Sequence, residues 1–221
     1  MAPAIAALVA VALAAIVLAR RPRSRAARTF AAFAASLALW NFAVYRFRVA
    51  ADAETAQRWQ LAVYVALFIA PALYYRLVHV IVGVPERRAS GLVYASTLGA
   101  LLAAALRFDL FVRGVTPTAE GWAPVSGPLA AVWFLVALAI TAATFRPLIL
   151  ARRQTGATRP ARPVVLLLLA TAIRLLGPLV SFAGVLLLRA GVLKAALPPV
   201  VVGAMVLVGC LAAVATLDSE S

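Results

Sequence analysis

The chain has 221 residues, of which 65% are apolar and only 13% are charged. A soluble globular domain carries about twice that charged fraction, so the composition argues against a soluble fold with one hydrophobic core. The formal net charge of +14 does not indicate a nucleic-acid partner, because the basic residues lie in short clusters between apolar runs. The composition therefore predicts a membrane protein whose first partner is the lipid bilayer.

Seven apolar runs are long enough to cross about 30 Å of hydrocarbon as helices that rise about 1.5 Å per residue. They cover residues 3–19, 29–48, 59–82, 91–107, 127–150, 163–188 and 197–217. The first and fourth runs are short and rich in alanine, so six spans with one interfacial helix stays an alternative. We expect a single all-α domain over residues 1–221, a polytopic bundle of seven transmembrane helices.

The basic residues indicate the orientation, because cytoplasmic connections of membrane proteins are enriched in Arg and Lys. With the N-terminus outside, the inner connections hold eleven arginines, and the outer side holds six basic residues. The inner set is Arg20, Arg21, Arg23, Arg25, Arg28, Arg87, Arg88, Arg152, Arg153, Arg159 and Arg162; the outer set is Arg48, Arg58, Arg107, Arg113, Arg189 and Lys194. The sequence therefore predicts an outside N-terminus and a cytoplasmic C-terminus in a multi-pass protein of the inner (plasma) membrane.

The longest outer connection reads DLFVRGVTPTAEGWAPVSG and is too short for a folded domain. Its Gly and Pro residues predict turns. An acidic patch, Asp52 with Glu54, follows the second run and is interpreted as a solvated turn. We expect no soluble domain at either end of the chain.

Chemistry-bearing side chains are scarce. The chain has one histidine, His79, and one cysteine, Cys210, and no carboxylate lies inside an apolar run. Neither the H-E-x-x-H spacing nor a glycine-rich phosphate loop is present. The last run has no lysine for a retinal Schiff base. We therefore expect no enzyme activity, no catalytic residue, no cofactor and no metal.

Two polar residues within apolar runs are the ligand-facing candidates, Arg174 and Asn41. Arg174 lies about 16 Å and Asn41 about 18 Å from the inner end of its run. An arginine at such depth faces the bundle interior and has a partner. We hypothesise that the two residues meet, through a direct hydrogen bond or around one ligand or water. The alternative is that each only strengthens helix association.

A second polar pair lies near the inner end of the third run. Arg76 and His79 are three residues apart and are expected to share a helix face. Snorkelling of both side chains to the inner headgroups is the simpler interpretation, and a proton-linked role for the histidine is the alternative.

Three segments together resemble the N-terminal seven-helix membrane region of bacterial sensor histidine kinases. They read LALWNFAVYRFRVAADAETAQRW, IAPALYYRLVHVIVG and SGPLAAVWFLVALAITAATFRPLILARRQTGATRPARPVVLLLLATAIRLLGPL. The features that carry the resemblance are the Trp-containing second span, the acidic turn before Trp59, the proline in the third span and the G-P-L entry to the fifth. The resemblance covers about residues 5–217.

The resemblance implies a sensor or signal-input module. No phosphoacceptor histidine box follows Leu217, so signalling is expected to pass through a separate cytoplasmic kinase or another membrane protein. The chain is then either a stand-alone module or part of a longer receptor, and its ligand and any homo-oligomer stay open. The alternative function is a small membrane transporter or an accessory subunit of one, with Pro71 and Pro178 as the helix breaks that transporters use. A purely structural membrane anchor is a third alternative.

Overall fold

The computed structural model describes residues 1–85, 88–119, 121–154, 162–189 and 200–218. Most of them are helical. The helices are α1 (Ala2–Arg20), α2 (Arg25–Arg48), α3 (Ala53–Val82), α4 (Arg88–Leu106), the 3-10 helix η1 (Phe108–Leu110), α5 (Pro128–Ala143), α6 (Phe145–Gln154), α7 (Arg162–Arg189) and α8 (Val200–Asp218). The strands are β1 (Val112–Thr118) and β2 (Gly121–Ser126). The expectation of an all-α chain is therefore corrected by one β-hairpin.

Four helical segments in the described part of the chain are long and apolar enough to cross a membrane. They are Ala2–Arg20, Arg25–Arg48, Ala53–Val82 and Pro128–Arg153. Two shorter apolar helical segments, Ser90–Leu106 and Leu207–Asp218, accompany them. Length and composition thus support a membrane protein.

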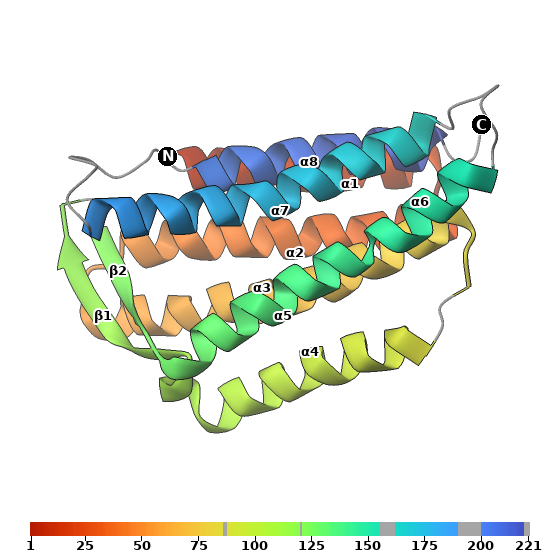
Figure 1. Cartoon of the computed structure of the whole chain (residues 1–221). Helices are drawn as coiled ribbons and strands as arrows, with labels where there is room; N and C mark the ends of the chain where they lie inside the picture. The colour runs from red at the N-terminus through yellow and green to blue at the C-terminus, as the bar shows by residue number, and fades with distance from the viewer. Residues whose placement is uncertain (86–87, 120, 155–161, 190–199, 219–221) are drawn as a thin grey trace.

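The long helices run side by side along one axis, with the β-hairpin across one end of the bundle (Figure 1). We call this the hairpin end, and the other the opposite end. α2 packs between α1 and α3, α8 packs on α7 and α1, and α4 lies at the edge next to α3. The main core joins α1, α2, α3, α6, α7 and α8. Its largest fully buried side chains include Phe30, Phe33, Tyr74, Leu148 and Leu167.

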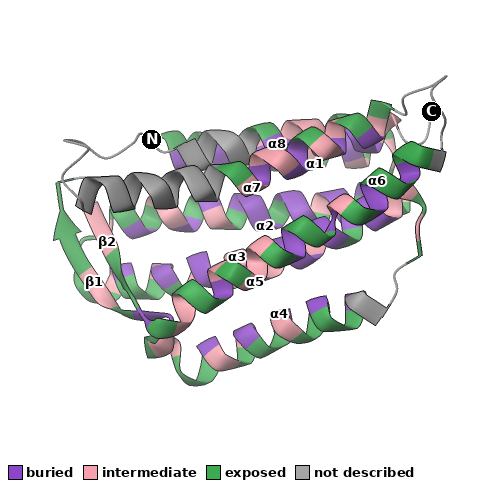
Figure 2. Cartoon of the chain, in the orientation of Figure 1, coloured by how far each residue is buried: buried purple, intermediate pink, exposed green. Residues whose placement is uncertain are grey.

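Many large apolar side chains point away from this core. Leu8 is 70% exposed, Leu92 is 76% exposed and Leu135 is 65% exposed. Figure 2 shows exposed residues along the outer sides of α4 and α5. Because water would penalise such surfaces and lipid accepts them, the outer faces suit a hydrocarbon environment.

Side-chain caps determine where two of the long helices begin. The Ser24 hydroxyl accepts a hydrogen bond of 3.0 Å from the Ala27 amide at the start of α2. At the start of α3, the Asp52 carboxylate accepts a hydrogen bond of 2.7 Å from the Thr55 amide and one of 3.0 Å from the Thr55 hydroxyl. The hydrogen bond from the Thr55 amide is the main cause that lowers the pKa of Asp52 below its usual value. α3 therefore begins six residues before the apolar run at residue 59.

The fifth predicted span, residues 127–150, is divided into α5 and α6. α5 ends at Ala143 and α6 begins at Phe145. Pro147 gives the physical reason, because a proline ring clashes with the carbonyl four residues earlier, here that of Ala143. The Thr144 amide instead bonds the Thr141 carbonyl at 3.1 Å. By contrast, α3 and α7 continue through Pro71 and Pro178 without interruption.

The β-hairpin is fastened to the turn between α2 and α3. β1 and β2 pair antiparallel, with Thr118 opposite Gly121. The Trp122 indole donates a 2.9 Å hydrogen bond to the Ala50 carbonyl. Gly121 has φ of +104°, and a Cβ there would lie 2.3 Å from the Arg48 carbonyl oxygen. The hairpin backbone can therefore approach the end of α2 only with glycine at this position.

Candidate functional site

Arg174 lies inside the bundle on α7 and is only 6% exposed. Its guanidinium carbon is 4.9 Å from the ring centroid of Tyr74 on α3 and 5.5 Å from that of Phe33 on α2. The two rings lie 5.3 Å apart, tilted by 46°. We call Arg174, Phe33 and Tyr74 the arginine cage. The cage joins three helices through cation–π contacts.

The level of the cage follows from side-chain direction. Phe33 is eight residues after the start of α2, and Tyr74 is eight residues before the end of α3, so both lie about 12 Å from the opposite end. The Cα of Arg174 is twelve residues, about 18 Å, from the start of α7. Helical side chains lean toward the helix N-terminus. The guanidinium therefore reaches down to the level of the rings.

A hydroxyl network fixes the Tyr74 side of the cage. Thr171 donates to the Leu167 carbonyl at 2.7 Å, so its oxygen accepts from the Tyr74 hydroxyl at 2.8 Å. Thr144, at the break between α5 and α6, lies 3.5 Å from the Thr171 hydroxyl. These contacts connect α3 and α7 to the helix break. They leave the polar end of Tyr74 satisfied, so its hydroxyl does not serve Arg174.

Arg174 has no anionic partner in the described part of the chain. Its Nη1 atom is buried and has no hydrogen-bond partner. The ion pairs of the described residues lie at the ends of the bundle: Arg58 with Glu54, Arg107 with Asp109 and Arg162 with Asp218. Among them, Arg107 and Asp109 are joined by two hydrogen bonds of 3.0 Å that lower the pKa of Asp109. Among the described residues, the contacts of this buried guanidinium are the rings of Phe33 and Tyr74.

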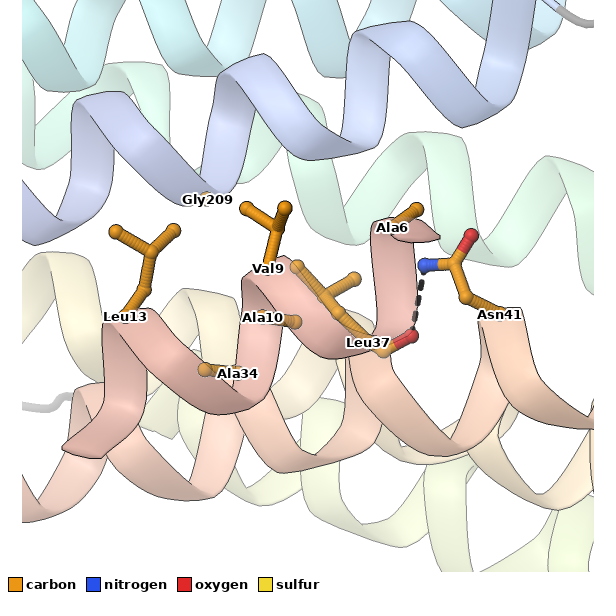
Figure 3. A pocket seen from close by; sticks show the side chains of 8 residues that line it. All are labelled: Ala6, Val9, Ala10, Leu13, Ala34, Leu37, Asn41 and Gly209. Atoms are coloured by element: carbon orange, nitrogen blue, oxygen red, sulfur yellow. Dashed lines mark hydrogen bonds between the residues drawn. The ribbon is translucent and has the colours of Figure 1, made fainter. Parts of the chain in front are cut away.

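Asn41 is the second predicted site residue, and it is 2% exposed. Its Nδ2 donates a 2.8 Å hydrogen bond to the Leu37 carbonyl within α2, and its Oδ1 is buried without a partner. Next to it is a cavity of about 10 Å³, which holds about one water molecule (Figure 3). The cavity is lined by Ala6, Val9, Ala10 and Leu13 of α1, by Ala34, Leu37 and Asn41 of α2, and by Gly209 of α8.

Asn41 and Arg174 do not form the predicted direct hydrogen bond. Arg174 contacts α2 at Phe33, eight residues before Asn41, which is about 12 Å along the helix and about 80° around it. Asn41 instead points toward α1 and α8. The sequence estimate treated the two residues as level because it counted from the apolar runs, whereas α2 begins at Arg25, and because it ignored the lean of the arginine. Whether each residue faces a ligand stays a prediction.

Arg76 and His79 have different environments despite their spacing. Arg76 is exposed, whereas His79 is 7% exposed. The His79 Nδ1 is 2.9 Å from the Tyr75 carbonyl, and its ring lies 4.2 Å from that of Tyr75. Snorkelling therefore fits Arg76 and is wrong for His79.

Sequence reasoning missed the partners of Arg174, namely Phe33 and Tyr74, and the bond of Thr171 to Tyr74. The apolar runs gave no signal for these contacts, because Phe33 lies four residues from the inner end of its predicted run and Tyr74 lies eight residues from that of its own. Among the described residues, no group of three or more His, Cys, Asp or Glu side chains is placed to hold a metal ion. Comparison of the chain with protein-family models and with curated proteins gave no match.

Proposed function

We propose that the chain is a seven-span protein of the inner membrane that acts as a signal-input module. It binds a ligand or a membrane partner and passes a change in helix packing to a separate cytoplasmic kinase. The observation that carries the proposal is the buried guanidinium of Arg174, which contacts two aromatic rings and no anion in the described residues. The resemblance of its apolar segments to the membrane region of sensor kinases supports the same assignment.

The proposed topology takes α1, α2, α3, α4, the pair α5–α6, α7 and α8 as seven spans. Each overlaps one of the seven apolar runs of the sequence. The arginine distribution supports an outside N-terminus. In this orientation the β-hairpin lies on the outer side, and the arginine cage lies nearer the cytoplasmic side.

Arg174 supports signalling because its burial costs free energy. An arginine at the middle of a transmembrane helix costs about 2.5–3.5 kcal/mol on the insertion scale. The two aromatic rings offset part of this cost, because each cation–π contact stabilises the guanidinium by about 0.5–2 kcal/mol. A carboxylate or another anion that reached Nη1 would stabilise the conformation that binds it, and this differential affinity is what shifts a population between two packings.

The transport alternative has weaker support. Transporters bind their substrates at interrupted helices near the midplane. The fifth span is interrupted between α5 and α6, whereas α3 and α7 continue through Pro71 and Pro178, the two breaks that the transport alternative named. The cavity next to Asn41 has room for about one water molecule. These features favour a bundle that changes packing over one that passes a solute.

The test is purification of the tagged full-length chain from native membranes, followed by addition of labelled ATP. We expect a co-purified kinase that acquires acid-labile phosphate, and we expect its labelling to change at least severalfold with Arg174→Leu. Arg146→Leu, at an exposed arginine of α6, is the matched control and should leave the labelling unchanged. Solute flux into liposomes that contain the purified chain alone would overturn the proposal in favour of transport. Equal labelling of the kinase with Arg174→Leu and Arg146→Leu would show that Arg174 has no part in signalling.

A further inference from the structure

A groove of about 420 Å³ lies at the opposite end of the bundle, between the first turns of α2 and the last turns of α3. It is lined by Arg25, Arg28, Thr29, Ala32, Leu73 and Arg76. Its volume falls in the range of about 300–1,000 Å³ that small-molecule sites occupy. The three arginines are exposed. Thr29 is buried, and its hydroxyl donates a 2.9 Å hydrogen bond to the Arg25 carbonyl. The groove therefore offers guanidinium donors from two helices.

The charge in this groove is not balanced by the described residues. Arg25, Arg28 and Arg76 form no ion pair with any carboxylate there, in contrast to Arg58, Arg107 and Arg162. The N-terminus of α2 adds the positive end of its helix dipole at the same place. Three like charges around one opening repel one another, so an anion that bridges them is favoured.

Polarity changes with depth in the groove. Arg76 lies six residues, about 9 Å, before the end of α3. Ala32 and Leu73 supply the apolar part of the lining, deeper along α2 and α3 than Arg25 and Arg28. A free phosphate ion would use only the arginines. An amphipathic anion uses both parts of the lining, with its phosphate at the arginines and an acyl chain against Ala32 and Leu73.

We propose that this groove binds the phosphate headgroup of an anionic phospholipid. Arg25 and Arg28 donate to the phosphate from α2, and Arg76 donates from α3. In the proposed orientation the groove opens to the cytoplasmic leaflet, where basic pockets between transmembrane helices bind anionic headgroups. The site does not require the signalling function, because its lining residues are distinct from the arginine cage.

The test uses the full-length protein in mild detergent and native mass spectrometry with added phosphatidylglycerol or phosphatidylcholine of equal chain length. We expect preferential retention of phosphatidylglycerol. Arg76→Gln should lower that retention about fivefold, the effect of one arginine near a lipid phosphate. The matched control is Arg58→Gln, at an exposed arginine near the other end of α3, which should retain phosphatidylglycerol like the wild type.

Further variants and a competing anion separate the remaining outcomes. Arg28→Gln repeats the charge test on the other helix and replaces Arg76→Gln if that variant does not fold by circular dichroism. Leu73→Ser should weaken lipid retention without removing an arginine. Equal retention of the two lipids, or equal retention by Arg76→Gln and Arg58→Gln, would overturn the proposal. Displacement of phosphatidylglycerol by millimolar inorganic phosphate would assign the groove to a soluble anion instead.

Discussion

Several buried polar atoms of the described residues have no hydrogen-bond partner, and two of them, Arg174 Nη1 and Asn41 Oδ1, belong to the predicted site residues. Their surroundings differ. Asn41 borders a cavity of about 10 Å³ whose other lining residues are apolar, and its amide nitrogen already donates to the Leu37 carbonyl. Arg174 instead packs against two aromatic rings. The unsatisfied atom of the arginine is expected to cost more free energy than that of the asparagine, because the guanidinium is charged.

Arg174→Leu is expected to leave the free energy of unfolding unchanged or to raise it by about 1–3 kcal/mol. The reason is that an apolar side chain removes a buried, uncompensated charge from the bundle. Phe33→Leu should lower the free energy of unfolding by about 1–2 kcal/mol, because it removes one cation–π face and keeps the buried charge. Unfolding by SDS titration in micelles, followed by circular dichroism, measures both changes.

Ile173→Leu, a conservative change beside Arg174 on α7, is the control for repacking. If Arg174→Leu lowered the free energy of unfolding by more than about 2 kcal/mol, as the loss of a buried polar contact does, the arginine would stabilise the bundle itself. That result would contradict a ligand-binding role for Arg174.

Sequence depth alone was enough to select Arg174 and Asn41 as buried polar residues. It could not identify their neighbours, because contacts depend on which side of each helix is turned inward. Phe33 and Asn41 lie on the same helix but face directions about 80° apart, so one meets α7 and the other meets α1 and α8. Helix rotation is fixed by packing against neighbours and not by the depth of a residue in its apolar run.

At the level of elements, the β-hairpin is the part that the sequence did not predict. Pro117 and Gly114 argued for turns, since both residues are depleted in strand interiors. In a two-stranded ribbon both strands are edges, so a proline without an amide hydrogen is tolerated. Phe111 and Val112, at the start of the ribbon, belong to one buried cluster with Phe68 and Trp133 of the bundle, in which the rings of Phe111 and Phe68 lie 5.0 Å apart; no local pattern in the sequence predicts these contacts.

Gly121→Ala is expected to release the hairpin from the turn between α2 and α3. The new Cβ would collide with the Arg48 carbonyl, and φ of +104° is strained for alanine, so we expect a loss of about 1–3 kcal/mol in docking free energy. Amide hydrogen exchange in β1 and β2 should rise, and the emission of Trp122 should shift to the red as its indole loses the Ala50 carbonyl.

Gly114→Ala is the matched control in the same hairpin, since an added Cβ there meets no atom within 4 Å and its φ is not positive. Unchanged exchange in Gly121→Ala, or the same increase in both variants, would contradict the close approach at Arg48.

The helix boundaries show which local signals the sequence offered. Asp52 is an N-cap residue that could have moved the start of the third helix back from residue 59. Pro147 likewise indicated the helix break at Thr144, although the apolar run 127–150 continues through Thr144 and Pro147. Hydropathy reports where a chain can enter lipid, whereas caps and prolines report where its backbone bonds begin and end.

For the whole molecule, the arrangement makes a prediction about the two sides of the membrane. In a Cys210→Ser background, Thr118→Cys in the hairpin should react with an impermeant maleimide on intact cells, because Thr118 is exposed at the proposed outer end. Arg23→Cys, in the connection between α1 and α2, should react only after permeabilisation. The cysteine-free parent controls for background, and labelling of Arg23→Cys on intact cells would refute the orientation.

Each of the seven apolar runs overlaps a helix in the described part of the chain, and four helical segments there are long and apolar enough to cross a membrane, because apolar length is visible in composition. The neighbour relations of the helices were not visible. Nothing in the runs shows that α8 returns to pack on α1, or that α4 lies at the edge. Those relations depend on side-chain complementarity between segments far apart in the sequence.

The fastening of the hairpin to the end of α2 has a mechanical consequence. The Trp122 bond to Ala50 and the close contact of Gly121 join the hairpin to one end of the α2–α3 pair, so we expect any tilt of these helices to pivot there. α3 has 30 residues and is about 45 Å long, and a tilt of about 5° about the held end moves its far end by about 4 Å. We therefore expect the hairpin to serve as the pivot of such a tilt, with the largest displacement at the far ends of α2 and α3.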